Sequence, residues 1–312
     1  MKKKKRHLKP IAIVIFSISI FIATQTINCF GPSSYKTDVG ELIDSHTPMG
    51  VLPEKSENIS EIITLDMSRV DVSKDILDDE ECDAVVNLDY SMLNKGLVFV
   101  SADNIEPRNL RISIYQDFSE VQSCHRIFKE GYYPLINGEG IYYLQIFIES
   151  SAGKFSGVAV TSFYAEFDEV EPFKYSNYAA TYYENSPLTQ QAFIITKDLD
   201  NYQDKVSAIT RALRIGIVYN IEYYDLAEEA GDCDTFYERG EGICYHFSAL
   251  FSAMMRSIGI PTREVRGSIT FGETIYHSWN EYYSDGEWHD VDVVNYKQQK
   301  WIEYIKDKNS ER

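Results

Sequence analysis

The chain has 312 residues, of which 44% are hydrophobic and 25% are charged. This length can hold about two domains, and the composition is typical of globular proteins and excludes disorder along most of the chain. The formal net charge is −18, and residues 1–29 contain six of the 30 basic residues but none of the 48 acidic ones. The remainder is therefore strongly acidic and would repel nucleic acids and anionic membrane surfaces, so we expect no nucleic-acid partner.

Residues 1–29 have the pattern of an export signal. A basic start, Met1–Arg6, precedes the apolar run Ile11–Ala23, which is shorter than the roughly 20 residues that span a bilayer. Basic residues ahead of such a run keep the N-terminus in the cytoplasm and send the rest outside. Cys29 is a candidate lipid-attachment site. Secreted, lipid-anchored and uncleaved-anchor forms stay open, and we expect an extracytoplasmic protein that meets the membrane only through this segment.

The next two segments differ in pattern. Residues 30–59 are rich in Pro, Gly, Ser and acidic residues without periodicity, which predicts a linker. Short alternating or apolar runs follow, such as Leu110–Tyr115 and Ile141–Ile148, with a turn signal at Asn137-Gly138. Several short strands at this spacing predict an antiparallel β-sandwich of the immunoglobulin-like type over residues 60–175.

The cysteines and acidic runs do not indicate a metal site. No CxxC pair exists and the six histidines are scattered, which matches no zinc pattern. The run Asp78–Glu81 lacks the spaced ligands and the glycine of a calcium loop. We therefore expect no metal and no organic cofactor. In an exported chain Cys82 and Cys124 can form a disulfide or remain as buried free thiols.

Helical patterns begin where the strand pattern ends, which predicts a second domain over residues 176–312. Ser186-Pro187 has the pattern of an N-cap followed by proline at the first helical position. Apolar residues between Tyr202 and Ile217 follow helical spacing and predict a second helix.

Cys244 lies in the first turn of a third predicted helix. Gly240 and Gly242 interrupt the chain before it, and apolar residues then recur at helical spacing up to Gly259-Ile260-Pro261. The dipole and the free N–H groups at a helix start favour a thiolate and can stabilise an oxyanion. A lone cysteine is more often packed as a small apolar residue, so this position alone does not assign a function.

A predicted β-hairpin carries the other two candidate residues. Strands Ile275–Tyr283 and Trp288–Val294 flank the turn Asp285-Gly286. With a two-residue turn, His277 lies opposite Val294 and Asp292 opposite Trp279. His277 and Asp292 are then diagonal neighbours on one face, roughly 7–8 Å apart at the backbone, and the aspartate can orient the imidazole.

The predicted register has two further consequences. A turn one residue longer would place the imidazole and the carboxylate on opposite faces of the hairpin. The register also sets Glu281 opposite Asp290, which is unfavourable unless water or a cation screens the two charges.

The C-terminal part resembles the transglutaminase-like superfamily of papain-related cysteine enzymes. Four short motifs carry the resemblance: Gly242-Ile243-Cys244, Gly259-Ile260-Pro261, His277-Ser278-Trp279-Asn280-Glu281 and Trp288-x-x-Val291-Asp292. The resemblance implies an α+β fold in which N-terminal helices pack on an antiparallel sheet. It also implies Cys244 as the nucleophile, His277 as the general base and acid, and Asp292 as the orienting carboxylate. Trp279, Gly242 and Tyr245 are candidate cleft or support residues.

This resemblance implies acyl transfer through a thioester, with a protein or peptide substrate. Water as the second acceptor gives a protease or amidase, which we favour, and a lysine amine gives a cross-link. The alternative is a non-catalytic function, in which a cell-surface binding or structural protein keeps the fold without turnover.

Overall fold

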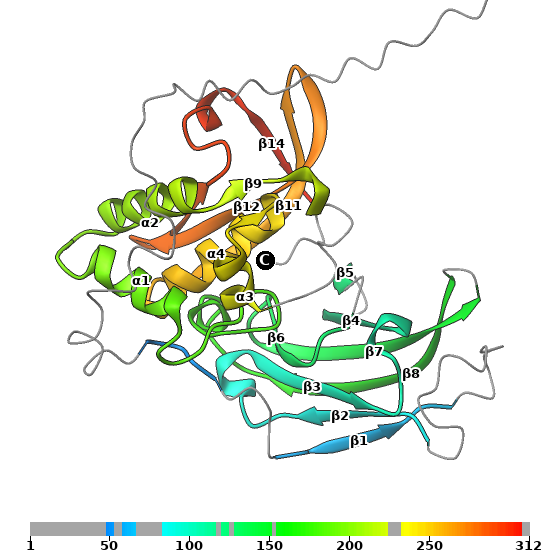
Figure 1. The fold of residues 1–312 in the computed structure, drawn as a ribbon. Helices are drawn as coiled ribbons and strands as arrows, with labels where there is room; N and C mark the ends of the chain where they lie inside the picture. The colour runs from blue at the N-terminus through cyan, green and yellow to red at the C-terminus, as the bar shows by residue number, and fades with distance from the viewer. Residues whose placement is uncertain are drawn as a thin grey trace, which may run out of the picture.

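The computed structural model describes most of the chain after residue 47 (Figure 1). The described ranges are 48–52, 58–66, 83–116, 120–124, 128–151, 154–223 and 232–307. The predicted export segment with Cys29, most of the predicted linker, the run Asp78–Glu81 and Cys82 lie outside them. The side chain of Cys124 is not described, so its pairing with Cys82 stays a prediction. Within the described ranges, no helix is long and apolar enough to cross a membrane.

Two four-stranded antiparallel sheets form the upstream part. Their orders are β1-β2-β3-β6 and β5-β4-β7-β8. The bounds are β1 (Glu61–Thr64), β2 (Val85–Asp89), β3 (Leu97–Asp103), β4 (Leu110–Gln116), β5 (Glu120–Cys124), β6 (Gly131–Pro134), β7 (Gly140–Ser151) and β8 (Lys154–Ala165). Short helices η5 (Leu93–Lys95), η6 (Pro107–Asn109) and η7 (Glu171–Lys174) lie between or after these strands.

Both upstream sheets contribute to one hydrophobic core. Leu88 of β2, Ile112 of β4 and Leu144 of β7 are fully buried in the same cluster. Successive strand residues point to opposite faces, so the alternating apolar pattern places one set of side chains on the inner face. Each fully buried side chain of this size contributes roughly 1.5–3 kcal/mol to folding. The two sheets lie together below the helices in Figure 1.

The described part of the chain has four α-helices, and the residues just before them determine where they begin. They are α1 (Pro187–Thr196), α2 (Tyr202–Gly216), α3 (Cys233–Arg239) and α4 (Cys244–Ser257). Ser186 is the N-cap of α1, with its Oγ 3.4 Å from the backbone N of Thr189, and the predicted start of this helix is confirmed. Asn201 caps α2 in the same way at 2.8 Å from Asp204 N. Such caps satisfy N–H groups that have no partner within the helix.

A third antiparallel sheet, of order β13-β12-β11-β14, packs against α4. Its strands are β11 (Thr262–Phe271), β12 (Glu273–Ser284), β13 (Glu287–Val291) and β14 (Glu303–Lys306), with η9 (Gln299–Trp301) before β14. The side-chain amide of Asn280 on β12 donates to Ser248 O and Ser252 Oγ of α4, both at 2.9 Å. The helix is therefore fixed to the sheet by buried hydrogen bonds as well as by apolar packing.

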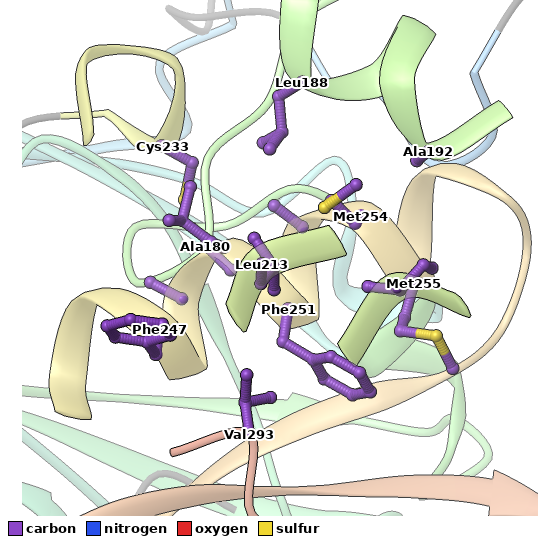
Figure 2. Packing of buried hydrophobic residues seen from close by; sticks show 14 of the residues in the cluster. Ala180, Leu188, Ala192, Leu213, Cys233, Phe247, Phe251, Met254, Met255 and Val293 are labelled. Atoms are coloured by element: carbon purple, nitrogen blue, oxygen red, sulfur yellow. The ribbon is translucent and has the colours of Figure 1, made fainter. Parts of the chain in front are cut away.

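The helices share a second hydrophobic core. Figure 2 shows Leu188 and Ala192 of α1 and Leu213 of α2 around Phe251 and Met254 of α4. The apolar face of α4 is therefore covered by the other helices. The chain as a whole combines helices with antiparallel sheets, whereas the predicted division into domains near residue 175 stays a prediction.

The predicted hairpin register is confirmed as far as the strand pairing extends. Asp285 and Gly286 have φ values of 54° and 86°, which are the left-handed angles of a two-residue hairpin turn. Ser284 pairs with Glu287, and the pairing continues to Asn280 opposite Val291.

The prediction that the returning strand reaches Val294 is wrong. Strand β13 ends at Val291, so the pairs of Asp292 with Trp279 and of His277 with Val294 do not form part of the ladder. The chain bends over residues 293–295, where the Asp292 side chain accepts the Asn295 N–H at 2.9 Å. The backbone N–H of Asp292, which points away from β12 in this register, donates to Oε1 of Gln299 at 3.0 Å.

Glu281 lies opposite Asp290 as predicted, and cationic side chains screen the two carboxylates. Arg263 Nε lies 2.6 Å from Glu281, and Lys306 contacts Glu281 and lies 3.2 Å from Asp290. The repulsion expected for this pair is therefore offset within the sheet.

Arg256 is a buried charge that joins α4 to two other segments. It is fully buried, and its Nε donates to Thr262 O at 2.6 Å and its Nη1 to Tyr175 O at 3.3 Å. The guanidinium also lies over the ring of Phe173. These contacts connect the end of α4, the start of β11 and the segment that follows the upstream sheets.

We expect Arg256→Met to lower the free energy of unfolding by about 2 kcal/mol, because the buried carbonyl of Thr262 and the carbonyl of Tyr175 lose a charged donor. The matched control Arg214→Met changes an exposed arginine of α2 and should stay within about 0.5 kcal/mol of the wild type. Urea unfolding followed by circular dichroism measures both. Equal unfolding free energies for the Arg256 variant and the wild type would contradict this role.

Candidate active site

Cys244 is the first residue of α4, and a short strand pair fixes the chain that leads to it. Strand β9 (Val218–Tyr219) runs parallel to β10 (Glu241–Gly242). The N–H of Val218 donates to Gly240 O at 2.8 Å, and that of Asn220 to Gly242 O at 2.9 Å. The thiol is therefore held at a helix N-terminus, where the dipole favours a negative charge.

Gly242 and His246 shape the start of α4. A Cβ at Gly242 would lie 2.7 Å from the Cβ of His246, so the close packing requires glycine. Nδ1 of His246 accepts the N–H of Ile243 at 3.1 Å and caps the helix. Burial lowers the pKa of His246 to about 4, so the imidazole stays neutral and remains an acceptor. We assign both residues a structural role beside the nucleophile.

His277 lies between Cys244 and Asp292. Its ring is hydrogen-bonded to the Cys244 side chain, and its Nε2 lies 2.9 Å from Oδ2 of Asp292. Because Nε2 meets the carboxylate, Nδ1 is the ring nitrogen left for the thiol. His277 and Asp292 are only 4% and 2% exposed. The structure thus brings together the three residues predicted from the sequence as a triad.

Burial and hydrogen bonding act in opposite directions on the charge of the thiol and the imidazole. Burial raises the pKa of Cys244, but the hydrogen bond and charge of His277, together with the backbone N–H groups of Ser278 and Tyr245, outweigh this and lower the pKa below its ordinary value. Burial lowers the pKa of His277, but its bonds to Asp292 and Cys244 outweigh this and raise the pKa to about 9. Both shifts favour a thiolate–imidazolium pair at neutral pH.

Asp292 receives several donors besides the imidazole. Its Oδ1 accepts the N–H of Asn295 at 2.9 Å, and its Oδ2 accepts the Asn295 side-chain amide at 3.0 Å and the Tyr304 hydroxyl at 2.8 Å. Burial raises the pKa of Asp292, and the bonds from His277 and Asn295 lower it below its ordinary value. The carboxylate therefore stays ionised opposite the imidazole.

The sequence predictions did not include Asn295 or Tyr304. The spacing of Asn295, three residues after Asp292, is a local signal, because aspartate side chains accept from backbone N–H groups a few residues on. Tyr304 has no such signal, since it reaches the site only through the pairing of β14 with β11.

Trp279 and Tyr245, the remaining predicted cleft residues, lie on two sides of the site. The indole of Trp279 is 1% exposed, lies nearly parallel to the His277 ring at 6.3 Å, and donates to Asp290 at 2.9 Å. The hydroxyl of Tyr245 accepts from Lys129 Nζ at 3.1 Å. Trp279 therefore packs beside the imidazole, and Tyr245 connects the start of α4 to the upstream part.

Cys233 differs from Cys244 in its surroundings. It is fully buried in the helical core, and burial raises its pKa well above the ordinary value. A thiol that stays protonated is a poor nucleophile. Of the two thiols on described side chains, Cys244 is the one arranged for reaction.

The C-terminal region matches a known family in sequence. Residues 189–293 match the transglutaminase-like superfamily, and this matched range includes all three triad residues. No curated protein matches the chain.

Several solved structures are similar to parts of the chain. A candidate cysteine protease from Cytophaga hutchinsonii is 16% identical, with 64% of this chain and 76% of that one covered and a TM-score of 0.39. The periplasmic domain of TgpA from Pseudomonas aeruginosa is 13% identical, with 78% and 96% covered and a TM-score of 0.33. Red sea bream transglutaminase is 11% identical, with 77% and 53% covered and a TM-score of 0.26.

We expect iodoacetamide to label Cys244 rapidly at pH 7, and His277→Ala to slow this at least about tenfold. Without the imidazole, burial leaves the thiol pKa at or above its ordinary value of about 8.5, so little thiolate remains. The control His289→Ala removes a histidine of β13 that bonds to Ser284 O and should label like the wild type. Peptide mass spectrometry locates and times the modification. Equal, slow labelling of the wild type and His277→Ala would contradict an activated thiol.

Proposed function

Because residues 189–293 match the transglutaminase-like superfamily, we propose that the protein is a cysteine-dependent enzyme that cleaves peptide or carboxamide bonds through a thioester. One observation carries this proposal. Cys244 at the start of α4 is hydrogen-bonded to His277, whose Nε2 lies 2.9 Å from Asp292. Nucleophilic catalysis requires a nucleophile, a base that contacts it, and a group that orients the base. Cys244, His277 and Asp292 are arranged in this order.

The first half of the reaction forms the acyl-enzyme. The Cys244 thiolate attacks the carbonyl carbon, a C–S bond forms, and the π electron pair moves to the carbonyl oxygen. Backbone N–H groups in the first turn of α4 stabilise this oxyanion. When the intermediate collapses, the C–N bond breaks and the His277 imidazolium gives its proton to the leaving amine.

The second half transfers the acyl group to an acceptor. His277, now neutral, takes a proton from the acceptor as it attacks the thioester, and the thiolate leaves. We propose water as the acceptor, which makes the enzyme a protease or amidase. The resemblance of the sequence motifs to exported bacterial members of the superfamily supports this choice. Cross-linking uses the same acyl-enzyme with a lysine amine as the acceptor.

We further propose that the upstream sheets form a β-sandwich domain and that the N-terminal segment exports the chain. The shared core of the two sheets supports the first proposal. The basic start followed by an apolar run supports the second. A protein or peptide substrate outside the cytoplasm fits both.

We expect a glutamine-bearing peptide incubated with the protein and a labelled amine to release ammonia or peptide fragments without incorporating the amine. Cys244→Ser should abolish the product, because the hydroxyl has no comparable ionised form at neutral pH. Mass spectrometry of the peptide distinguishes the outcomes. Amine incorporation would show cross-linking instead, and the absence of any product with a range of peptides would favour a non-catalytic binding protein.

Asp292→Asn should reduce turnover on the order of 10²- to 10⁴-fold, because a neutral amide neither stabilises the imidazolium nor fixes its orientation. The control Asp285→Asn makes the same change at the exposed hairpin turn, where asparagine tolerates the left-handed angle. It should leave turnover unchanged. Initial rates on a cleaved peptide measure both variants. An Asp292 variant within about threefold of the wild type would exclude the carboxylate from catalysis.

A further inference from the structure

Strand β13 is an edge of the sheet that carries His277, because it pairs only with β12. The N–H of Asp292, just after the strand, points away from β12 and donates to Gln299. Backbone groups of alternate residues point the same way, so those of Trp288 and Asp290 also point outward. Within the described ranges, these two residues form no backbone hydrogen bond on that side. Such an open edge can pair with another strand.

A cavity of about 660 Å³ follows this edge. Four consecutive residues of β13, Trp288–Val291, line it. Side chains of successive strand residues point to opposite faces, so a cavity that touches all four runs along the backbone edge. Its volume is in the range of ligand pockets. Among the described residues, neither Cys244 nor His277 lines it, so the cavity is separate from the catalytic cleft.

The inner part of the cavity is apolar and aromatic. Val206 of α2 and Tyr282 of β12 line it and are almost fully buried. The ring of Tyr282 stacks on that of His289 at 5.3 Å, and its hydroxyl donates to Oε1 of Gln203 at 3.0 Å. These contacts hold the ring in place, so the cavity offers a fixed surface to an apolar side chain.

Two lysines give the rim of the cavity a positive charge. Lys297 and Lys300 are exposed and line it. Asp290 is the only acidic residue among the described residues of the lining, and its carboxylate accepts Trp279 Nε1 at 2.9 Å and lies 3.2 Å from Lys306. The rim therefore attracts an anionic ligand, although the formal net charge of the chain is −18.

We propose that the outer edge of β13 binds an extended acidic peptide by strand addition. The backbone of the peptide exchanges hydrogen bonds with Trp288 and Asp290, and an apolar side chain packs against Tyr282. Acidic side chains contact Lys297 and Lys300. In this mode the main-chain bonds supply affinity, and the side-chain contacts supply specificity. The site does not depend on the proposed acyl transfer.

A fluorescein-labelled Val-Glu-Val-Glu-Val-Glu peptide tests the site, with fluorescence anisotropy as the measure of binding. The protein carries Cys244→Ser, so that turnover does not consume the peptide. We expect the same peptide with glutamine in place of glutamate to bind at least about tenfold more weakly, because it loses the contacts with the lysines.

Backbone methylation of the peptide tests strand pairing. Only one of the two alternating sets of peptide N–H groups faces a neighbouring strand. Of two isomers, N-methylated at the valines or at the glutamates, we expect one to bind at least about tenfold more weakly and the other to bind within about threefold of the parent peptide.

The combined substitution Lys297→Gln and Lys300→Gln tests the rim. It should weaken binding of the acidic peptide at least about tenfold and leave the glutamine peptide within about threefold. The matched control, Lys154→Gln with Lys197→Gln, removes two exposed lysines of β8 and of the end of α1. It changes the net charge equally and should bind the acidic peptide like the unsubstituted protein.

Each other outcome overturns the proposal. No binding of the acidic peptide, or equal binding of the acidic and glutamine peptides, would show that the cavity does not select an anion. Equal binding of the two methylated isomers would exclude strand addition. An unchanged affinity without Lys297 and Lys300 would place the peptide elsewhere, such as in the catalytic cleft, and an equal loss in the control would show unspecific attraction.

Discussion

The catalytic region depends on the buried contact between His277 and Asp292, because burying these charges is energetically costly. Both side chains are almost fully buried, and a charge in such a place costs several kcal/mol unless it is paired and hydrogen-bonded. The surrounding elements offset this cost. Asn295, in the segment after β13, and Tyr304 of β14 donate hydrogen bonds to Asp292, and the Cys244 thiolate of α4 supplies a negative charge beside His277. Three separate segments of the chain thus meet at this buried pair.

The residues around the thiol have different chemical roles, which follow from the same geometry. His277, oriented by Asp292, sets the charge of Cys244 and transfers protons, whereas the N–H groups at the start of α4 act on the substrate oxygen. Thiolate formation and oxyanion stabilisation are distinct physical effects, one electrostatic in the resting state and one realised only in the transition state. Reagents that need only a thiolate therefore report on the first effect separately from the second.

The hairpin and the helix start could be predicted because their signals are local. Asp285-Gly286 determines the register, and the glycines before Cys244 mark the start of α4. The end of β13 was predicted three residues too far along the chain, because residues 293–295 bend and the Asp292 side chain accepts the Asn295 N–H there. Tyr304 could not be predicted, since it reaches the site through the pairing of β14 with the distant strand β11. Asn295 had a local signal, its spacing from Asp292.

The central claim is that Cys244 is a thiolate at neutral pH because His277 carries the proton. The most direct measurement is the ultraviolet absorbance of the thiolate as a function of pH, taken as the difference between the wild type and Cys244→Ser. We expect one thiolate to be present at pH 7 and to disappear only as the pH falls through a lowered thiol pKa. A difference signal that appears only as the pH approaches the ordinary thiol value of about 8.5 would contradict the account.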